Sequence, residues 1–82
     1  MVFMYYVYIL QSLLSLDRYY IGFTEDLKRR MTEHNSGSCN HTSKHVPWKL
    51  KNYVAFENKE KAKQFEEYLK SGSGRIFTKK HF

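Results

Sequence analysis

Two tyrosines, an arginine, a histidine and a glutamate could form a group that does chemistry if the fold brings them together. They are Tyr8, Tyr20, Arg30, His34 and Glu66. Phenol and imidazole groups can exchange protons, a guanidinium can hold an anion, and a carboxylate can bind a hard divalent cation. Whether they act together depends on the elements that carry them.

The tyrosines fall on two predicted strands. Residues 3–10 and 18–23 are rich in β-branched and aromatic residues, which favours an antiparallel hairpin. Alternation places Tyr6 and Tyr8 on one face of the first strand, and Tyr20 can project toward the same side. The alternative for each tyrosine is ordinary aromatic packing across strands.

The other candidates fall on two predicted helices. Thr24 is placed as the N-cap of a helix over residues 25–35, and Asn58 is placed to cap a second helix over residues 59–70. At the start of each predicted helix, the side-chain oxygen of the cap residue can accept a hydrogen bond from a backbone N–H of the first turn. The candidates Arg30 and Glu66 would therefore lie on different helices.

A third strand is predicted over residues 48–56, after a polar loop over residues 36–46. The order β-β-α-β-α predicts the α+β class, with a three-stranded antiparallel sheet flanked by helices. A chain of 82 residues has room for a single domain, residues 1–82. Its core is expected at about residues 3–70, followed by a basic C-terminal tail at residues 71–82.

Helical geometry puts polar groups on or beside the packing faces. His34 shares a stripe with Leu27 and Met31, and Arg30 lies at its edge. On the second helix Glu66 falls within the breadth of the apolar stripe. Because charged groups are rarely buried without a partner, an internal Arg30–Glu66 ion pair beside a hydrogen-bonded core histidine is the alternative to a catalytic site.

The charge of the chain favours a polyanionic partner. The formal net charge is +6, and from Lys44 onward ten Lys or Arg residues face four acids. This excess favours nucleic acid, although many lysines simply solvate helix faces. The side chains expected to contact nucleic acid are Lys28, Arg29, Lys44, His45, Lys70 and Arg75.

The single cysteine, Cys39, excludes an intrachain disulfide and favours a cytoplasmic location. Its spacing from His41 and His45 matches no strong zinc-binding pattern. The apolar start, residues 1–16, is short, is interrupted by polar residues and lacks a basic leader, so no membrane segment is expected.

The tyrosine segments resemble the two-part motif of the GIY-YIG nuclease domain. Tyr6-Val7-Tyr8 and Tyr20-Ile21-Gly22 correspond to its two halves, Arg30 follows Tyr20 by ten residues, and Glu66 lies in the second helix. The resemblance covers nearly the whole chain and extends to the small stand-alone bacterial members. These bacterial members are an uncharacterised group that is described simply as GIY-YIG domain proteins.

The resemblance implies a role for each candidate. Tyr8 would activate the attacking water, and Tyr20 would hydrogen-bond that water or the scissile phosphate. His34 would help to deprotonate Tyr8, Arg30 would hold the phosphate, and Glu66 would bind one Mg²⁺ or Mn²⁺ ion. A guanidinium and a metal ion suit phosphodiester hydrolysis, which builds negative charge on the non-bridging oxygens.

The protein is expected to be a metal-dependent endonuclease that acts on DNA rather than RNA. It is expected to select the structure of the DNA rather than its sequence, and to be a monomer by default. Three departures from the family pattern keep alternatives open. Tyr6 occupies a glycine position, Phe23 occupies a position that is often lysine, and no asparagine follows Asn58. The alternatives are a nucleic-acid-binding module without turnover and a small adaptor that binds a protein partner.

Overall fold

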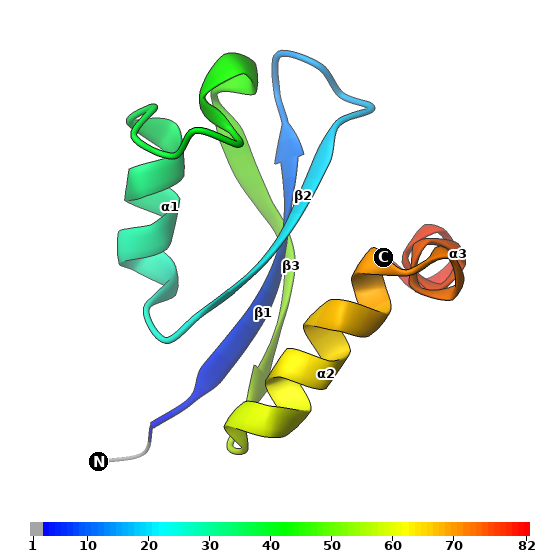
Figure 1. Ribbon diagram of the computed structural model, residues 1–82. Coiled ribbons are helices and arrows are strands. Elements are labelled where there is room, and N and C mark those ends of the chain that lie inside the picture. The colour runs from blue at the N-terminus through cyan, green and yellow to red at the C-terminus, as the bar shows by residue number, and fades with distance from the viewer. Residues whose placement is uncertain (1–2) are drawn as a thin grey trace.

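The computed structural model describes residues 3–82 and shows a three-stranded antiparallel sheet between helices (Figure 1). The elements in chain order are β1 (Tyr5–Ser12), β2 (Tyr19–Thr24), α1 (Leu27–Asn35), the 3-10 helix η1 (Ser43–His45), β3 (Trp48–Phe56), α2 (Lys59–Lys70) and α3 (Gly72–His81). The strand order is β2-β1-β3, so β1 is central. The predicted α+β class is confirmed.

The two faces of the sheet carry different layers. Helix α1 covers one face, and α2 and α3 lie on the other (Figure 1). Along β1, Tyr8 and Leu10 belong to the cluster on the α1 side, whereas Val7 and Ile9 belong to the cluster on the α2 side. The side-chain alternation of one strand thus divides the core into two compartments.

The compartment on the α2 side has an apolar cluster at its centre. Ala62 and Leu69 of α2 are fully buried against Val7 and Ile9, and Phe65 packs at their margin. Ala62, Phe65 and Leu69 form the apolar stripe of α2. Burial of this stripe holds α2 on the sheet, because each fully buried aliphatic side chain contributes about 1.5–3 kcal/mol.

Gly22 makes room for a tyrosine in the other compartment. In the register of β1 and β2, Gly22 lies opposite Tyr8. A Cβ atom built on Gly22 would overlap the phenol ring of Tyr8. The glycine of the second tyrosine motif is therefore required by the packing of the first tyrosine.

Helix α1 begins later than predicted, and its N-cap is Asp26 rather than Thr24. Asp26 Oδ1 accepts a hydrogen bond from Arg29 N at 3.0 Å. Thr24 ends β2, is buried, and accepts from Asp26 N at 3.0 Å through its hydroxyl. The Thr24 side chain is occupied in the turn before the helix, so Asp26, two residues on, caps the helix instead.

The prediction of a basic tail over residues 71–82 is wrong, because this segment forms α3. Ser71 caps the helix by accepting a hydrogen bond from Gly74 N at 3.1 Å. Phe77 and Phe82 pack against the apolar compartment, so the core extends past residue 70. A Cβ on Gly74 would overlap the backbone of α2, and this close approach turns the chain directly from α2 into α3.

Strand β1 is displaced by two residues from the predicted range. Gln11 and Ser12 continue the pairing, and Ser12 lies opposite Trp48 of β3. Ser12 is fully buried, and its hydroxyl donates to the carbonyl oxygen of His45 at 2.6 Å. The two polar residues were expected to end the strand, but hydrogen bonds satisfy Ser12 inside the fold.

Candidate active site

A buried hydrogen bond joins the first tyrosine to the histidine of α1. Tyr8 Oη lies 2.9 Å from His34 Nε2, and both side chains are almost completely buried. Tyr8 comes from the central strand and His34 from the last turn of α1, 26 positions along the chain. Residues that the sequence separates widely therefore form one polar pair inside the core.

Thr42 orients the imidazole from its other side. Its Oγ1 lies 2.8 Å from His34 Nδ1 and 3.5 Å from the carbonyl oxygen of Cys39. The Thr42 hydroxyl has one proton to donate. The Cys39 carbonyl oxygen can only accept a hydrogen bond, so the hydroxyl donates to it and must accept from His34 Nδ1. We therefore assign the proton on His34 to Nδ1, which donates to Thr42. In this tautomer Nε2 is free to accept the proton of Tyr8.

The loop that carries Thr42 is fixed from two directions. The indole Nε1 of Trp48 donates to the Thr42 carbonyl oxygen at 2.8 Å. The amide of Asn35, at the end of α1, donates to Trp48 O at 3.0 Å and accepts from Trp48 N at 2.6 Å. Thr42 itself is fully buried. Its position against His34 is thus set by α1 and β3 together.

Tyr20 stands beside this pair and is more accessible than Tyr8. Its ring centroid lies 5.0 Å from that of His34 and 6.4 Å from that of Tyr8. Tyr8 is 1% exposed, whereas Tyr20 is half-buried. The two motif tyrosines and the histidine therefore form one aromatic cluster, in which Tyr20 is the tyrosine that reaches the surface.

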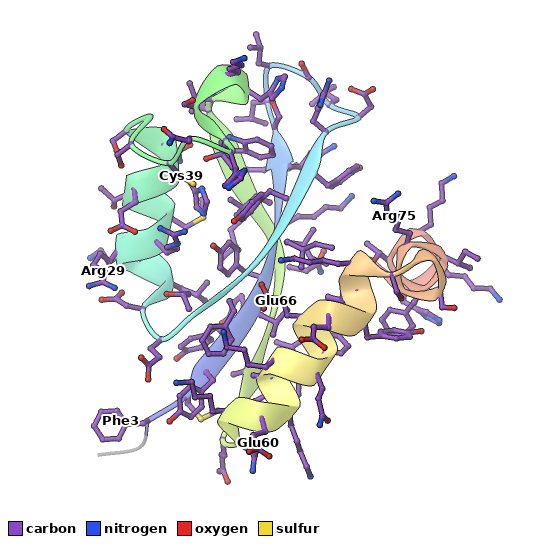
Figure 2. All side chains as sticks on the ribbon, in the orientation of Figure 1. Phe3, Arg29, Cys39, Glu60, Glu66 and Arg75 are labelled. Carbon is purple, nitrogen blue, oxygen red and sulfur yellow. The ribbon has the colours of Figure 1, made fainter. Side chains whose placement is uncertain are left out.

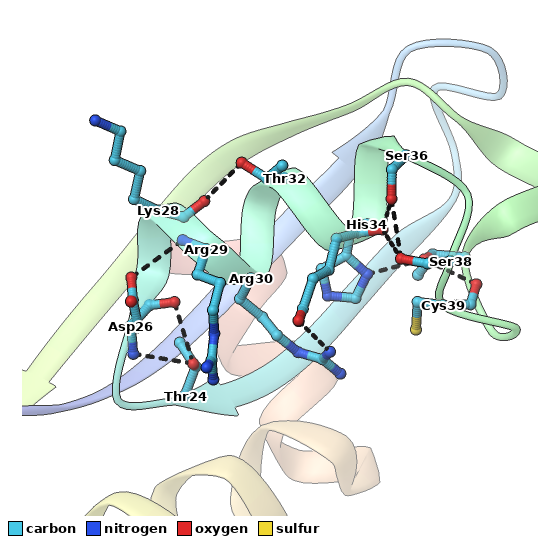
Figure 3. Close-up of polar contacts among 12 residues, drawn as sticks. Thr24, Asp26, Lys28, Arg29, Arg30, Thr32, His34, Ser36, Ser38 and Cys39 are labelled. Atoms are coloured by element: carbon cyan, nitrogen blue, oxygen red, sulfur yellow. Dashed lines mark hydrogen bonds and ion pairs between the residues drawn. The ribbon is translucent and has the colours of Figure 1, made fainter.

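Arg30 lies at the edge of the cluster and is held by Glu33. Its Nη1 donates to Glu33 Oε1 at 2.8 Å, as the close-up of α1 shows (Figure 3). The ion pair raises the pKa of Arg30 and lowers the pKa of Glu33. About a third of each side chain is exposed, so solvent screens the pair and an anion can reach the guanidinium.

Burial favours the neutral forms of both Tyr8 and His34. Burial raises the pKa of Tyr8 to about 12, an effect that the nearby Arg30 guanidinium partly offsets. Burial, with a further contribution from Arg30, lowers the pKa of His34 below its ordinary value. At neutral pH the pair is therefore a phenol beside a neutral imidazole.

The thiol of Cys39 belongs to the same surroundings. Burial disfavours its thiolate, but hydrogen bonds from Thr42 and the His41 backbone and the charge of Arg30 outweigh this and lower the pKa of Cys39. In residues 3–82, no three His, Cys, Asp or Glu side chains are grouped as a metal site. The cysteine and the loop histidines thus form no such cluster.

Glu66 lies apart from the cluster. It projects from α2, on the other side of the sheet from α1 (Figure 2). The carboxylate is 15% exposed and accepts a hydrogen bond from Lys70 Nζ at 3.1 Å. The alternative of an internal Arg30–Glu66 ion pair is wrong, because each of these residues pairs with a neighbour on its own helix.

Glu66 is the candidate residue with a carboxylate that could bind a divalent ion. Mg²⁺ is commonly held by one or two carboxylates, with waters and substrate phosphate as the other ligands. Glu66 offers one carboxylate, and the side chain of its partner Lys70 is about half exposed. Glu66 is the one carboxylate among the candidate residues, and it lies across the sheet from Arg30, so a metal ion here would take the rest of its ligands from water and substrate.

The expected nucleic-acid contacts divide between the two sides of the sheet. On the α1 side, Lys28, Arg29 and Lys44 are exposed, whereas His45 is half-buried beside Trp48. Lys70 and Arg75 are exposed on the opposite side, at the end of α2 and on α3. The structure thus gathers the cations into two groups instead of one stripe.

The profile of the GIY-YIG catalytic domain matches residues 4–80. The chain belongs to the GIY-YIG family. This finding confirms the resemblance drawn from the two tyrosine segments. A GIY-YIG relative, the UPF0213 protein YsiG of Lactococcus lactis, is 40% identical over 67 residues, which cover 80% of this chain and 62% of that protein.

Two further GIY-YIG relatives support the assignment. A UPF0213 protein of Halobacterium salinarum is 34% identical over 68 residues, covering 82% of this chain and 86% of its own. The solution NMR structure of a UPF0213 protein from Bacillus halodurans has a TM-score of 0.56 and 34% identity, and the match covers 93% of this chain and 80% of that one.

The match covers less than two thirds of some relatives. It spans 62% of YsiG and 54% of a UPF0213 protein from Streptococcus pneumoniae, which is 43% identical. Within residues 3–82, no helix of the GIY-YIG domain has the length and hydropathy needed to cross a bilayer.

Thr42 is the contributor to the candidate site that the sequence reasoning did not assign. Its residue type alone predicts nothing in a polar loop, and its partner His34 lies eight positions away. The sequence feature that could have pointed to this loop is Trp48. A buried indole N–H needs a hydrogen-bond acceptor, and here the acceptor is the Thr42 carbonyl oxygen.

Proposed function

We propose that this chain is a divalent-metal-dependent endonuclease that hydrolyses phosphodiester bonds in DNA and selects branched, flapped or single-stranded forms. The observation that carries the proposal is the buried Tyr8–His34 hydrogen bond with Arg30 at its edge. Thr42 orients the far nitrogen of the imidazole, so its near nitrogen faces the phenol of Tyr8. Membership of the GIY-YIG family supports the same reaction class.

In the proposed mechanism, His34 draws the proton of Tyr8 through Nε2 while Nδ1 remains bonded to Thr42. The pKa of Tyr8, about 12, and the lowered pKa of His34 oppose complete transfer in the free protein. The transfer therefore needs additional positive charge near the phenolate. Arg30 supplies part of it, and Tyr20, which reaches the surface, orients the attacking water or the phosphate.

Arg30 binds the scissile phosphate after exchanging its partner. Glu33 occupies the guanidinium in the free protein, and a phosphate with more charge and more acceptor oxygens would replace that carboxylate. A planar guanidinium can bind two phosphate oxygens at once. It would stabilise the negative charge that develops on them during hydrolysis.

Glu66 is the residue that would hold one Mg²⁺ or Mn²⁺ ion. When bound, the ion supplies Lewis-acid stabilisation of the phosphate oxygens. Lys70, released from Glu66, would be free to contact the nucleic-acid backbone. A single site of this kind cuts one strand at a time, as a monomer in the cytoplasm.

The test is cleavage of labelled linear, nicked, flapped and four-way DNA with Mg²⁺ or Mn²⁺ and with EDTA. Tyr8→Phe keeps the ring and should lower the rate by about 10²–10⁴, the usual contribution of acid–base catalysis. Tyr53→Phe, on an exposed tyrosine, is the matched control and should leave the rate unchanged. Glu66→Gln should lose activity, whereas its exposed neighbour Glu67→Gln should retain it. Cleavage that persists in Tyr8→Phe and Glu66→Gln would disprove the proposal.

The second candidate is a nucleic-acid-binding module without turnover. Two observations favour it: Tyr8 is 1% exposed, and Glu66 is paired with Lys70 outside the aromatic cluster. Such a module would bind DNA with a steep salt dependence and would cleave none of the substrates. Absence of both binding and cleavage would favour the protein-binding adaptor instead.

A further inference from the structure

A groove of about 810 Å³ lies between the sheet and α3. Its apolar lining comes from Ile9 and Ile21 of the strands, Leu69 of α2, and Ile76 and Phe82 at the other wall. We refer to it as the α3 groove. It exists because the segment after Ser71 folds into a helix that stands beside the sheet (Figure 1).

Four cationic side chains border the α3 groove. They are Lys51, Lys70, Arg75 and Lys79, and in the described part of the chain Asp17 is the single acidic residue of its lining. Arg75 extends from α3 toward the β1–β2 hairpin (Figure 2). Lys51 lies over the ring of Tyr19, with its Nζ 4.9 Å from the ring centroid. An apolar floor is thus enclosed by positive charge.

The α3 groove adjoins the candidate active site along β2. Tyr20 lines the groove, and its ring packs against His34 on the α1 side of the sheet. Lys70, which lines the groove, is the partner of Glu66. A nucleic-acid strand bound at Glu66 would therefore meet the cations that border the groove.

The lining fits single-stranded nucleic acid better than duplex. In a duplex the base faces are stacked inside the helix, so they could not pack on the apolar floor of the groove. A single strand offers both groups that the groove can bind, phosphates for the cations and base faces for the apolar and aromatic lining. The charge and the apolar floor point to the same ligand.

We propose that the α3 groove binds a single-stranded arm of nucleic acid next to the site of cleavage. The proposal rests on the proposed function in taking nucleic acid as the partner, and it names the form of substrate that the site accepts. Binding needs neither the metal ion nor Tyr8. It can therefore be measured separately from cleavage.

The experiment measures fluorescence anisotropy of a labelled oligo-dT of about 12 nucleotides, in EDTA, over a range of salt concentrations. The full chain should bind it more tightly than a duplex of the same length. The double variant Arg75→Gln, Lys79→Gln should weaken binding. It should also reduce the slope of log K against log salt by about 1.4, because each lost phosphate contact on a single strand contributes about 0.7.

The matched control is the double variant Lys59→Gln, Lys61→Gln, which removes the same charge from exposed positions of α2 that do not line the groove. It should leave the slope unchanged. Equal losses in the two double variants would show general surface charge and overturn the proposal. Equal binding of duplex and single strand by the unmodified chain would overturn it as well.

A second variant tests the apolar lining without touching charge. Ile76 is 68% exposed, so Ile76→Gln should leave the fold intact, as thermal unfolding by circular dichroism would check. It should weaken oligo-dT binding several-fold with an unchanged salt slope; unchanged affinity would contradict the groove. A protein that binds oligo-dT in this way but never cleaves DNA would refute the proposed nuclease and leave the groove standing.

Discussion

The two faces of one sheet solve the problem of burial in different ways. On the α2 side, Val7, Ile9, Ala62 and Leu69 exclude water by apolar packing. On the α1 side, polar groups are buried and each finds a partner, as in the Tyr8–His34 hydrogen bond. Apolar packing tolerates exchange among side chains of similar volume, whereas a buried polar network is stable only when every member is satisfied. Burying the polar network on the α1 side therefore costs free energy of folding, and the apolar packing on the α2 side offsets that cost.

The first prediction concerns the stability that apolar packing on the α2 side contributes. Leu69→Ala should lower the free energy of unfolding by about 2–5 kcal/mol, because it deletes a fully buried side chain and leaves a cavity. Denaturation by urea would measure the change. Leu14→Ala, at a leucine that is 65% exposed, is the control and should have little effect. If both variants behaved alike, α2 would not be held by this packing.

A second prediction concerns the polar side at high pH. The pKa of Tyr8 is about 12 in the fold against an ordinary value of 10, so the unfolded chain loses this proton first. The stability conferred by the neutral phenol is present below pH 10 and is lost as the pH rises toward 12. By linkage the loss amounts to about 2–3 kcal/mol.

The measurement is the free energy of unfolding between pH 9 and pH 12, compared in the unmodified chain and in Tyr8→Phe. The phenylalanine variant has no phenol to ionise at this position, so its curve should fall less steeply over that interval. Parallel curves would show that Tyr8 is not held in its neutral form by burial.

The third prediction tests the contact between the two tyrosine motifs. Gly22→Ala places a methyl group against the phenol of Tyr8 and should destabilise the protein by about 1–3 kcal/mol through overpacking. Gly72→Ala is the matched control, because nothing lies within 4 Å of the added methyl group. A crystal or NMR structure of Gly22→Ala should show a displaced Tyr8 ring. A variant as stable as the control would refute the proposed reason for the glycine.

Much of the scaffold was predictable from local patterns. β3 and α2 match their predicted bounds, because a run of strand-favouring residues after Pro47 marks one element and an asparagine cap marks the start of the other. The stripe of α1 that contains His34 was also correct, since helical periodicity determines which residues share a face. These elements depend on short-range sequence signals.

The features that were missed depend on long-range contacts. The segment after Ser71 contains two glycines and reads as a break, yet it is helical because Phe77 and Phe82 find an apolar surface on the sheet and α2. The placement of Glu66 on the face away from Tyr8 follows from the side on which α2 crosses the sheet. Periodicity within one helix does not encode that side.

The amide of Asn35 has a consequence for how copies of the molecule meet. β3 is an edge strand, and the N–H and C=O of Trp48 that bond to Asn35 are not used in pairing with β1. The side chain occupies the positions at which the backbone of a foreign strand would bond. Asn35 thus caps the sheet edge against strand addition, which protects an exposed edge from aggregation. The residue that helps to fix the Thr42 loop thus also occupies the free bonding groups of Trp48 at that edge.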